Sequence, residues 1–321
     1  MSREAGGAAA SSDSATEPQR HQEDGNQGVA SGRTPLERTA DAAEELYRLR
    51  DTFFPRDPAE KAAALRARAD DALAVLDSLP PEQRKTPQQR AVYEFLRGKI
   101  FNVFPDYHKE AEDHLSKADK DETMKCNPDL YYNCATADKY LENYERALRG
   151  FEAAALKDPG LGADTEVQKI ISLLDKLDSV MKGQLRFKRL ASSVSSLSEV
   201  NIKSSHKKAT IGILSEGLNK TVAVLGKVVL SIRHDNVAPM YYLTCDLDQS
   251  YFILSVYGLR NEAIKEGDRV ALLDPFYRIL DISWKEQVRN FKLFIFFSKD
   301  FIFDPYLGSA NVCCQKGRTI E

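Results

Sequence analysis

Apolar residues in the first half of the chain recur at the spacing of one face of an α-helix. In the stretch from 143 to 159, Tyr144, Ala147, Leu148, Phe151 and Ala154 fall at positions i, i+3, i+4, i+7 and i+10. Apolar stripes of the same kind run through residues 62–79, 87–103, 108–118 and 166–181. The pattern therefore predicts a series of short amphipathic helices. Thr86 followed by Pro87 has the residue types that begin a helix.

Two of these helix pairs fit the template of a tetratricopeptide repeat, whose period is about 34 residues. With Pro159 as the closing proline, Tyr131, Tyr144, Ala147, Phe151 and Ala154 take the characteristic aromatic and small positions, and Ala135 replaces the usual glycine. A second, degenerate copy runs from 93 to 118, with Gly98 at the expected close helix contact. Two ordinary helical hairpins would give the same pattern. The amphipathic stretch 166–181 is suited to closing such an array.

From Thr221 onward the apolar pattern changes to that of β-strands. Five β-rich runs, 222–233, 240–247, 250–259, 268–276 and 277–284, are separated by turn residues, and a short helical segment, R-N-E-A-I, is expected between the third and fourth. This order predicts a barrel of the OB type, with a small sandwich as the alternative. The chain is thus expected to be α+β with two domains, an α-solenoid of tetratricopeptide-like helix pairs followed by the barrel.

Aromatic residues on the barrel are candidates for stacking on nucleic-acid bases. They are Tyr241, Tyr242, Tyr251, Phe252 and Tyr257. Because side chains alternate between the two faces of a strand, about half of them are expected in the core. Basic residues in this part of the chain are few, which weakens the nucleic-acid interpretation.

Charge divides the chain into unequal parts. The 321 residues carry a net charge of −3 and are 42% hydrophobic, so the whole protein does not resemble a nucleic-acid or membrane-surface binder. The connector 182–208 nevertheless holds seven Lys or Arg and one Glu, a net charge of +6. Such a segment is suited to phosphate contact, although a solvated linker would look the same. Residues 1–40 have the composition of a disordered tail.

No arrangement in the sequence points to catalysis, a metal or a cofactor. The five cysteines lack paired C-x-x-C spacing, and reduced thiols are expected. The five histidines occur in no H-E-x-x-H motif and no nucleophile arrangement. We therefore expect a protein that is not an enzyme.

The strongly apolar run 293–297 is far shorter than the roughly 20 residues that cross a bilayer.

Several stretches together resemble the tetratricopeptide repeat protein 5 family. They are LYRLRDTFF, GKIFNVFPDYHKEAEDHLSKA, NPDLYYNCATADKYLENYERALRGFEAAALKDP, KGQLRFKRL, VAVLGKVVLSI and GDRVALLDP, in this order. The resemblance implies an adaptor that recognises the N-terminal peptide of nascent tubulin, docks on the ribosome and promotes decay of tubulin mRNA in the cytoplasm. It also implies the family's alternative role, a nuclear scaffold in stress-responsive transcription that works with a histone acetyltransferase.

The resemblance assigns roles to particular residues. Asp129 and Asn133 would belong to the peptide groove, where the Asp129 carboxylate could pair with a cationic peptide group. Arg186 and Lys188, with Lys182 and Arg189 beside them, would contact ribosomal phosphates. The N-P-D-L motif around Asp129 also reads as a plain helix start, with Pro128 in the first turn.

Two departures from the family pattern shape the expected domains. The stretch LSKADKDETMKCNPDL joins a first repeat directly to the last one, so the family's central repeats are missing. The peptide groove would therefore be incomplete. In addition, Ala163 stands where the family has an acidic groove residue. From Val288 the resemblance ends, and the apolar LFIFF run would be an aggregation hazard unless a strand includes it. The expected parts are a tail at 1–40, helical repeats at 41–181, a linker at 182–208, an OB domain at 209–287 and a divergent tail at 288–321.

Overall fold

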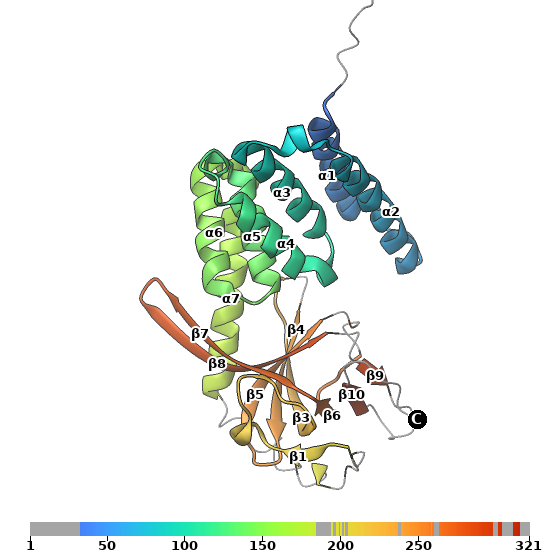
Figure 1. Ribbon diagram of the computed structural model, residues 1–321. Helices are drawn as coiled ribbons and strands as arrows, with labels where there is room; N and C mark the ends of the chain where they lie inside the picture. The colour runs from blue at the N-terminus through green and yellow to red at the C-terminus, as the bar shows by residue number, and fades with distance from the viewer. Residues whose placement is uncertain are drawn as a thin grey trace, which may run out of the picture. The chain divides into compact units, whose positions relative to one another are not determined.

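The computed structural model describes residues 33–183, 205–236, 239–257, 263–297, 301–303 and 311–314, together with residues 194, 197, 198, 200, 202 and 259. Residues from Pro35 onward form one compact unit. Its first part is helical and its second part is a curled sheet (Figure 1). The α+β architecture expected from the sequence is therefore confirmed.

Within residues 33–183, seven helices form three consecutive pairs and a last single helix. The pairs are α1 (Pro35–Thr52) with α2 (Pro58–Asp77), α3 (Pro87–Phe101) with α4 (His108–Ala118), and α5 (Pro128–Tyr140) with α6 (Tyr144–Lys157), followed by α7 (Ala163–Lys182). The array is one pair longer than the two expected, because α1 and α2 pack together as well. Helix α1 begins at Pro35, inside the 1–40 stretch.

Local sequence signals set the starts of these helices. At α3, the Thr86 hydroxyl accepts from Gln89 N at 3.1 Å and the Gln89 side chain accepts from Thr86 N at 3.0 Å, a complete capping box. Pro87 occupies the first turn, where its missing N–H costs nothing. The start expected at Thr86 and Pro87 is confirmed.

Small residues allow the helices of a pair to approach closely. A Cβ atom added at Gly98 of α3 would lie 2.6 Å from Leu115 Cγ of α4, and one at Gly150 of α6 would lie 2.9 Å from Ala135 Cβ of α5. The close contact expected at Gly98 is therefore present. Tyr144 and Phe151 fill the space beside the second crossing and are buried with α7.

The second half folds into a twisted sheet whose strands run in the order β2-β7-β8-β5-β4-β3-β6-β10-β9, with β1 beside β3. Their bounds are β1 Lys207–Ala209, β2 Gly217–Leu218, β3 Val222–Ile232, β4 Met240–Asp246, β5 Tyr251–Tyr257, β6 Arg269–Leu273, β7 Phe276–Trp284, β8 Gln287–Phe297, β9 Phe301–Phe303 and β10 Asn311–Cys314. Strand β7 follows β6 after two residues, although they lie far apart in this order. The chain thus connects strands that lie toward opposite ends of the path, as in an OB-type barrel.

The five expected β-rich runs correspond to β3 to β7, and a further strand follows them. Strand β8 pairs antiparallel with β7 and parallel with β5, where Ile253 lies opposite Leu293. The apolar run 293–297 is therefore part of a barrel strand, and ten residues of the expected divergent tail belong to β8, with β9 and β10 lying further along the same tail. The expected helical segment R-N-E-A-I lies mostly outside the described residues.

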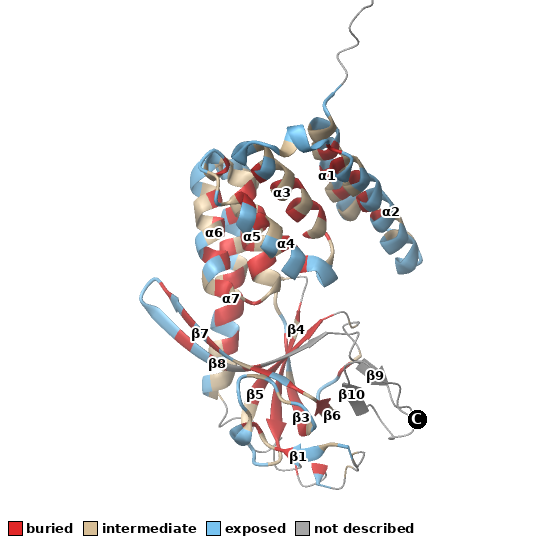
Figure 2. Ribbon diagram, viewed as in Figure 1, coloured by how far each residue is buried: buried red, intermediate tan, exposed pale blue. Residues whose placement is uncertain are grey.

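One hydrophobic cluster joins the helices to the sheet. Residues of α6 and α7, among them Phe151 and Leu174, share it with Leu280 and Trp284 of β7 and Phe291 of β8. The β7–β8 hairpin lies beside α7 (Figure 1), and both elements carry buried residues (Figure 2). Its turn uses Lys285 and Glu286, both with positive φ, as in the tight turns that suit strand twist.

Candidate peptide-binding surface

Asp129 lies in the first turn of α5, on the side where α1, α3 and α5 meet. The Asn127 side chain caps the helix by accepting from Asp129 N at 3.0 Å, and Pro128 fills the first helical position. The N-P-D-L motif is therefore a helix start, which confirms the alternative interpretation of the motif. The same turn also fixes the backbone that carries the Asp129 carboxylate.

Asp129 is paired inside the protein. Its Oδ2 contacts the ammonium group of Lys99 from α3, and the same ammonium group lies 2.6 Å from Glu44 Oε1 of α1. Burial opposes the charge of Lys99, but the Asp129 carboxylate and then Glu44 outweigh it, so the pKa of Lys99 is raised. The Lys99 side chain is 8% exposed, whereas Asp129 is 32% and Glu44 70% exposed. Two accessible acids thus flank one buried cation.

Asn133 lies one turn after Asp129 and is buried. Its amide group donates to Asp129 O at 2.9 Å and to Asp129 Oδ1 at 3.0 Å. Its oxygen accepts from the Tyr47 hydroxyl at 2.8 Å and from Asn102 Nδ2 at 3.1 Å. Asn133 therefore positions the Asp129 carboxylate from beneath.

A buried histidine continues this polar network. His108 Nδ1 lies 3.2 Å from Asn102 Oδ1, and the imidazole stacks on the Tyr140 ring with centroids 4.0 Å apart. Burial lowers the pKa of His108 to about 4, so the ring is neutral near pH 7. The sequence patterns singled out neither His108 nor Lys99. Their only sequence signal is that each is a polar residue at a position where the apolar stripe of its helix would place an apolar one.

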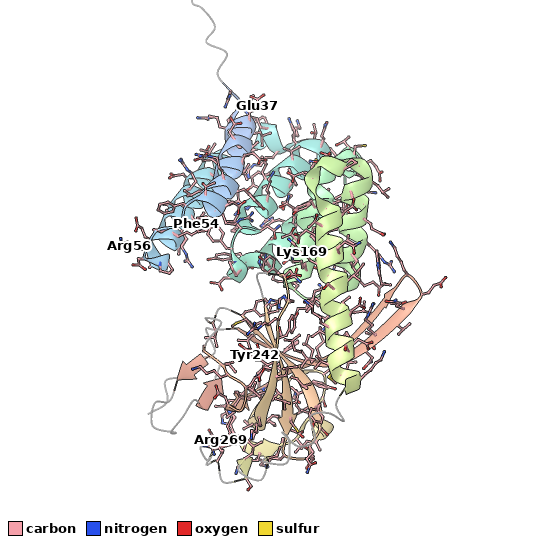
Figure 3. All side chains as sticks on the ribbon, turned by 180° about the vertical axis from the view of Figure 1, so that it is seen from behind. Glu37, Phe54, Arg56, Lys169, Tyr242 and Arg269 are labelled. Atoms are coloured by element: carbon pink, nitrogen blue, oxygen red, sulfur yellow. The ribbon has the colours of Figure 1, made fainter. Side chains whose placement is uncertain are left out.

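Charged groups of both signs act on Tyr132, one turn after Asp129 on α5. The Arg50 guanidinium lies over the Tyr47 ring at 4.6 Å and pairs with Asp51 at 2.7 Å. On α7, Glu166 accepts from Lys139 of α5 at 2.6 Å and from Lys169 at 2.7 Å. Lys169 is labelled on α7 in Figure 3. The surface can thus offer paired partners to a peptide that carries both a cation and an acid.

The basic connector is only partly described. Arg186, Lys188 and Arg189 lie outside the described residues, and their expected phosphate contacts stay predictions. Lys182 ends α7, is 75% exposed and pairs with Asp178 at 2.5 Å. A cation at this position also favours the helix C-terminus.

Four of the five aromatic candidates on the barrel are buried. Tyr241, Tyr242, Phe252 and Tyr257 are 5% exposed or less, and Tyr251 is half-buried. The reason is that β4 and β5 are central strands: Tyr241 packs in the cluster shared with the helices, and Tyr242 and Phe252 pack in the barrel interior. Figure 3 shows Tyr242 among the side chains of the sheet. The expected stacking platform for bases is therefore wrong for these four residues.

The described residues contain no group of three or more His, Cys, Asp or Glu placed to hold a metal ion. No described helix is both long and apolar enough to cross a bilayer. Three described cysteines are free, and burial raises the pKa of Cys134 to about 12 and that of Cys245 to about 11. These two thiols are therefore poor nucleophiles near pH 7.

The fold defines a class, a helical-repeat protein with an OB-type domain at its C-terminal side, and known proteins share it. The family model described as the tetratricopeptide repeat protein 5 OB fold domain matches residues 205–295. Tetratricopeptide repeat protein 5 from Homo sapiens is 30% identical over 206 residues, that from Bos taurus 31% and that from Mus musculus 30%; each match covers 58% of this chain and 47% of the relative. Over the matched residues, the chain is therefore similar to tetratricopeptide repeat protein 5.

The chain spans about half the length of the curated relatives it matches. The OB match ends at 295, eight residues beyond the expected boundary of 287, in agreement with strand β8.

Proposed function

We propose that the chain is a non-enzymatic adaptor that binds the N-terminal peptide of nascent tubulin on the surface around Asp129 and contacts ribosomal RNA through its basic connector. The observation that carries the proposal is the arrangement of Asp129 itself. Lys99 and Asn133 hold its carboxylate in one orientation while a third of the side chain stays accessible. The choice of peptide rests on the resemblance to the tetratricopeptide repeat protein 5 family noted in the sequence.

The local charge favours a cationic partner. Glu44 and Asp129 carry two negative charges, and Lys99 supplies one positive charge between them, so the cluster is net negative. An N-terminal amine or an arginine side chain brought to this cluster gains a charge-assisted hydrogen bond. Because Asn133 already fixes the Asp129 carboxylate, little side-chain entropy is lost when the bond forms.

Peptide binding can be measured directly by fluorescence anisotropy with a labelled Met-Arg-Glu-Ile peptide and the full chain. We expect saturable binding that Asp129→Asn weakens about tenfold or more, because a hydrogen bond to a charged group contributes about 1.5–3 kcal/mol. The matched control is Asp113→Asn on α4, whose carboxylate is 61% exposed and distant from this network. A peptide of the same composition in scrambled order should not bind.

The result that would overturn peptide recognition is a folded chain, verified by circular dichroism, that binds the ordered and scrambled peptides equally. Equal affinity of the Asp129→Asn variant and the wild-type chain would show instead that binding uses a different surface. Circular dichroism of each variant separates loss of contact from loss of fold.

Ribosome contact needs its own test, because Arg186 and Lys188 lie outside the described residues. We expect co-sedimentation with ribosomes to fall steeply with salt and to be lost when both residues become Glu, since each phosphate contact releases a counterion. Unchanged co-sedimentation of that variant would contradict the ribosome role. A partner contact that survives the charge reversal, such as binding to a histone acetyltransferase, would instead favour the nuclear scaffold.

A further inference from the structure

The turn between α5 and α6 carries a charged residue type into the interior of the protein. Glu142 is 0% exposed, and its φ of 58° places it in the left-handed region that a non-glycine residue seldom adopts. Neither feature is needed to connect two helices. The backbone conformation instead directs the side chain away from the helices and into the curled sheet.

The sheet provides two hydroxyl groups for this carboxyl group. Glu142 Oε1 accepts from the Tyr241 hydroxyl of β4 at 2.6 Å and from the Ser255 hydroxyl of β5 at 2.6 Å. The Tyr144 hydroxyl of α6 in turn contacts that of Tyr241. The side chain of a helical turn thus bridges two central strands of the OB domain.

The rest of the turn is fixed to the sheet as well. The Tyr257 hydroxyl of β5 donates to Tyr140 O at 2.6 Å. The Arg278 guanidinium of β7 donates to Leu141 O at 3.3 Å and to Asn143 Oδ1 at 3.1 Å. Each residue from 140 to 143 therefore makes a hydrogen bond to the sheet, and these bonds hold the helical array against the OB domain.

The carboxyl group of Glu142 lacks a cation as a hydrogen-bonding partner. Among the described residues, only Tyr241 and Ser255 hydrogen-bond to it, while Oε2 is buried without a partner. Arg278 lowers the pKa of Glu142 from a distance, but burial is the largest influence, and the pKa is raised to about 7. Removing Oε2 from water leaves its negative charge uncompensated when the group ionises.

Other titratable groups face the same turn. Asp138 of α5 accepts from Asn143 Nδ2 at 3.2 Å and pairs with Arg146 at 3.3 Å, and burial raises its pKa to about 6. The His234 ring packs against the Tyr241 ring with centroids 5.3 Å apart. Tyr144, Tyr241 and Tyr257 stay protonated because burial raises the pKa of each phenol.

We propose that Glu142 is a proton-operated latch between the helical array and the OB domain, tight when its carboxyl group is protonated and loosened when it ionises. The proposal does not depend on peptide or ribosome binding. It follows from a buried carboxyl group that joins the two domains through neutral hydroxyl donors. The Arg278 donors, the nearest positive charge, are already engaged by Leu141 O and Asn143 Oδ1.

The direction of the pH effect follows from proton linkage. The pKa of Glu142 is raised from 4.5 to about 7 in the folded chain, so the folded state binds the proton more tightly than the unfolded state. The stabilisation is complete below the unfolded pKa and is lost as pH rises through about 7. A change of cellular pH around neutrality would thus alter how firmly the two domains are joined.

Trp284 provides the measurement, because it is the single tryptophan of the chain and is buried where the β7–β8 hairpin packs on the helices. We expect the Trp284 emission of the full chain to shift to longer wavelength between pH 6 and 8.5, with a midpoint near the pKa of Glu142, about 7. The near-isosteric variant Glu142→Gln should keep the low-pH emission throughout. Ser255→Ala should move the midpoint to higher pH, because the Ser255 hydroxyl favours the ionised form.

Two results would overturn the latch: a wild-type emission that is constant over this range, or a pH-dependent shift that persists unchanged in Glu142→Gln. The matched control is Asp138→Asn, which removes the neighbouring carboxyl group and should leave the transition near pH 7 in place. If circular dichroism shows Glu142→Gln to be unfolded, the direction of the Ser255→Ala shift decides. An upward shift supports the latch, and an unchanged midpoint contradicts it.

Discussion

His108 illustrates how burial sets the charge of a single side chain. It is enclosed between Asn102 and the Tyr140 ring, and a proton on its imidazole would have to be held away from water. Its pKa is therefore lowered to about 4, and the folded chain binds the proton more weakly than the unfolded chain does. The stability that it contributes is complete above pH 6.5 and is lost as pH falls toward 4.

A variant makes this contribution measurable. In urea unfolding followed by circular dichroism, we expect His108→Gln to lower the free energy of unfolding more at pH 7 than at pH 5, by about 1–2 kcal/mol. The reason is that at pH 5 His108 is protonated in the unfolded wild-type chain but not in the folded one, which already lowers the stability of the wild type. The comparison between chains is needed because Glu142 acts in the opposite direction over the same range. An equal cost at both pH values would show that His108 titrates normally.

The resemblance identified Asp129 and Asn133 but not Lys99, which also holds the Asp129 carboxylate. Asp129 belongs to a recognisable N-P-D-L motif, whereas Lys99 looks like any solvated lysine of an amphipathic helix. Lys99 is buried only because α1 and α5 approach α3 on that side and bring two acids to it. The burial of Glu142 could not be predicted from the local sequence for the same reason. Its burial depends on strands that lie about a hundred residues further along the chain.

At the scale of elements, Gly98 determines how closely α3 and α4 pack. We expect Gly98→Ala to lower the free energy of unfolding by about 1–3 kcal/mol, because the new Cβ would meet Leu115 Cγ at 2.6 Å and force the helices apart. Alanine's better helix propensity, worth about 1 kcal/mol, offsets part of this cost. Urea unfolding at fixed pH provides the measurement.

The matched control for this prediction is Gly183→Ala at the end of α7. A Cβ there meets no heavy atom within 4 Å, and the backbone φ of −76° suits any residue. We expect a change of less than about 0.5 kcal/mol, as for a surface substitution that affects no contact. If both variants were equally stable, the close approach at Gly98 would have no energetic importance.

Periodicity identified most helices and the five main strands, and it missed others, among them α1 and β8. The helical stripes and the five alternating runs correspond to observed helices and to β3 through β7. Strand β8 lacks alternation in its second half, L-F-I-F-F, although it pairs with β7 and, in parallel, with β5. Period-2 alternation is the sequence signal of a half-buried strand. The run 293–297 therefore carried no strand signal, and its pairing depends on residues about forty positions earlier in the chain.

At the scale of the whole molecule, the helices and the sheet share one hydrophobic cluster. Leu174 of α7 belongs to it together with Leu280 and Trp284 of β7. Ion pairs between Lys285 and Glu152 and between Arg289 and Asp175, each at 2.5 Å, border the same contact. Neither part can unfold without exposing the apolar face of the other, so they should unfold together.

We expect this cooperativity to appear in urea unfolding at pH 6, where Glu142 is protonated. Circular dichroism at 222 nm follows the helices and Trp284 emission follows the hairpin, and the two transitions should coincide. Leu174→Ala should move both to lower urea by the same amount, at a cost of about 2–5 kcal/mol. Separate midpoints in the wild type would show that the two domains unfold independently.

The parallel pairing of β8 with β5 also determines when the protein can finish folding during synthesis. The helices are complete once Lys182 has left the ribosome, but the hairpin that covers α7 ends only at Phe297. At about 5–20 residues per second, the ribosome needs on the order of ten seconds to make the intervening residues. For that interval α7 lacks the strands that complete the hydrophobic cluster to which Ile170 and Leu174 belong. The nascent chain thus carries an incompletely covered apolar surface until β8 joins the sheet, and such a surface is prone to aggregation.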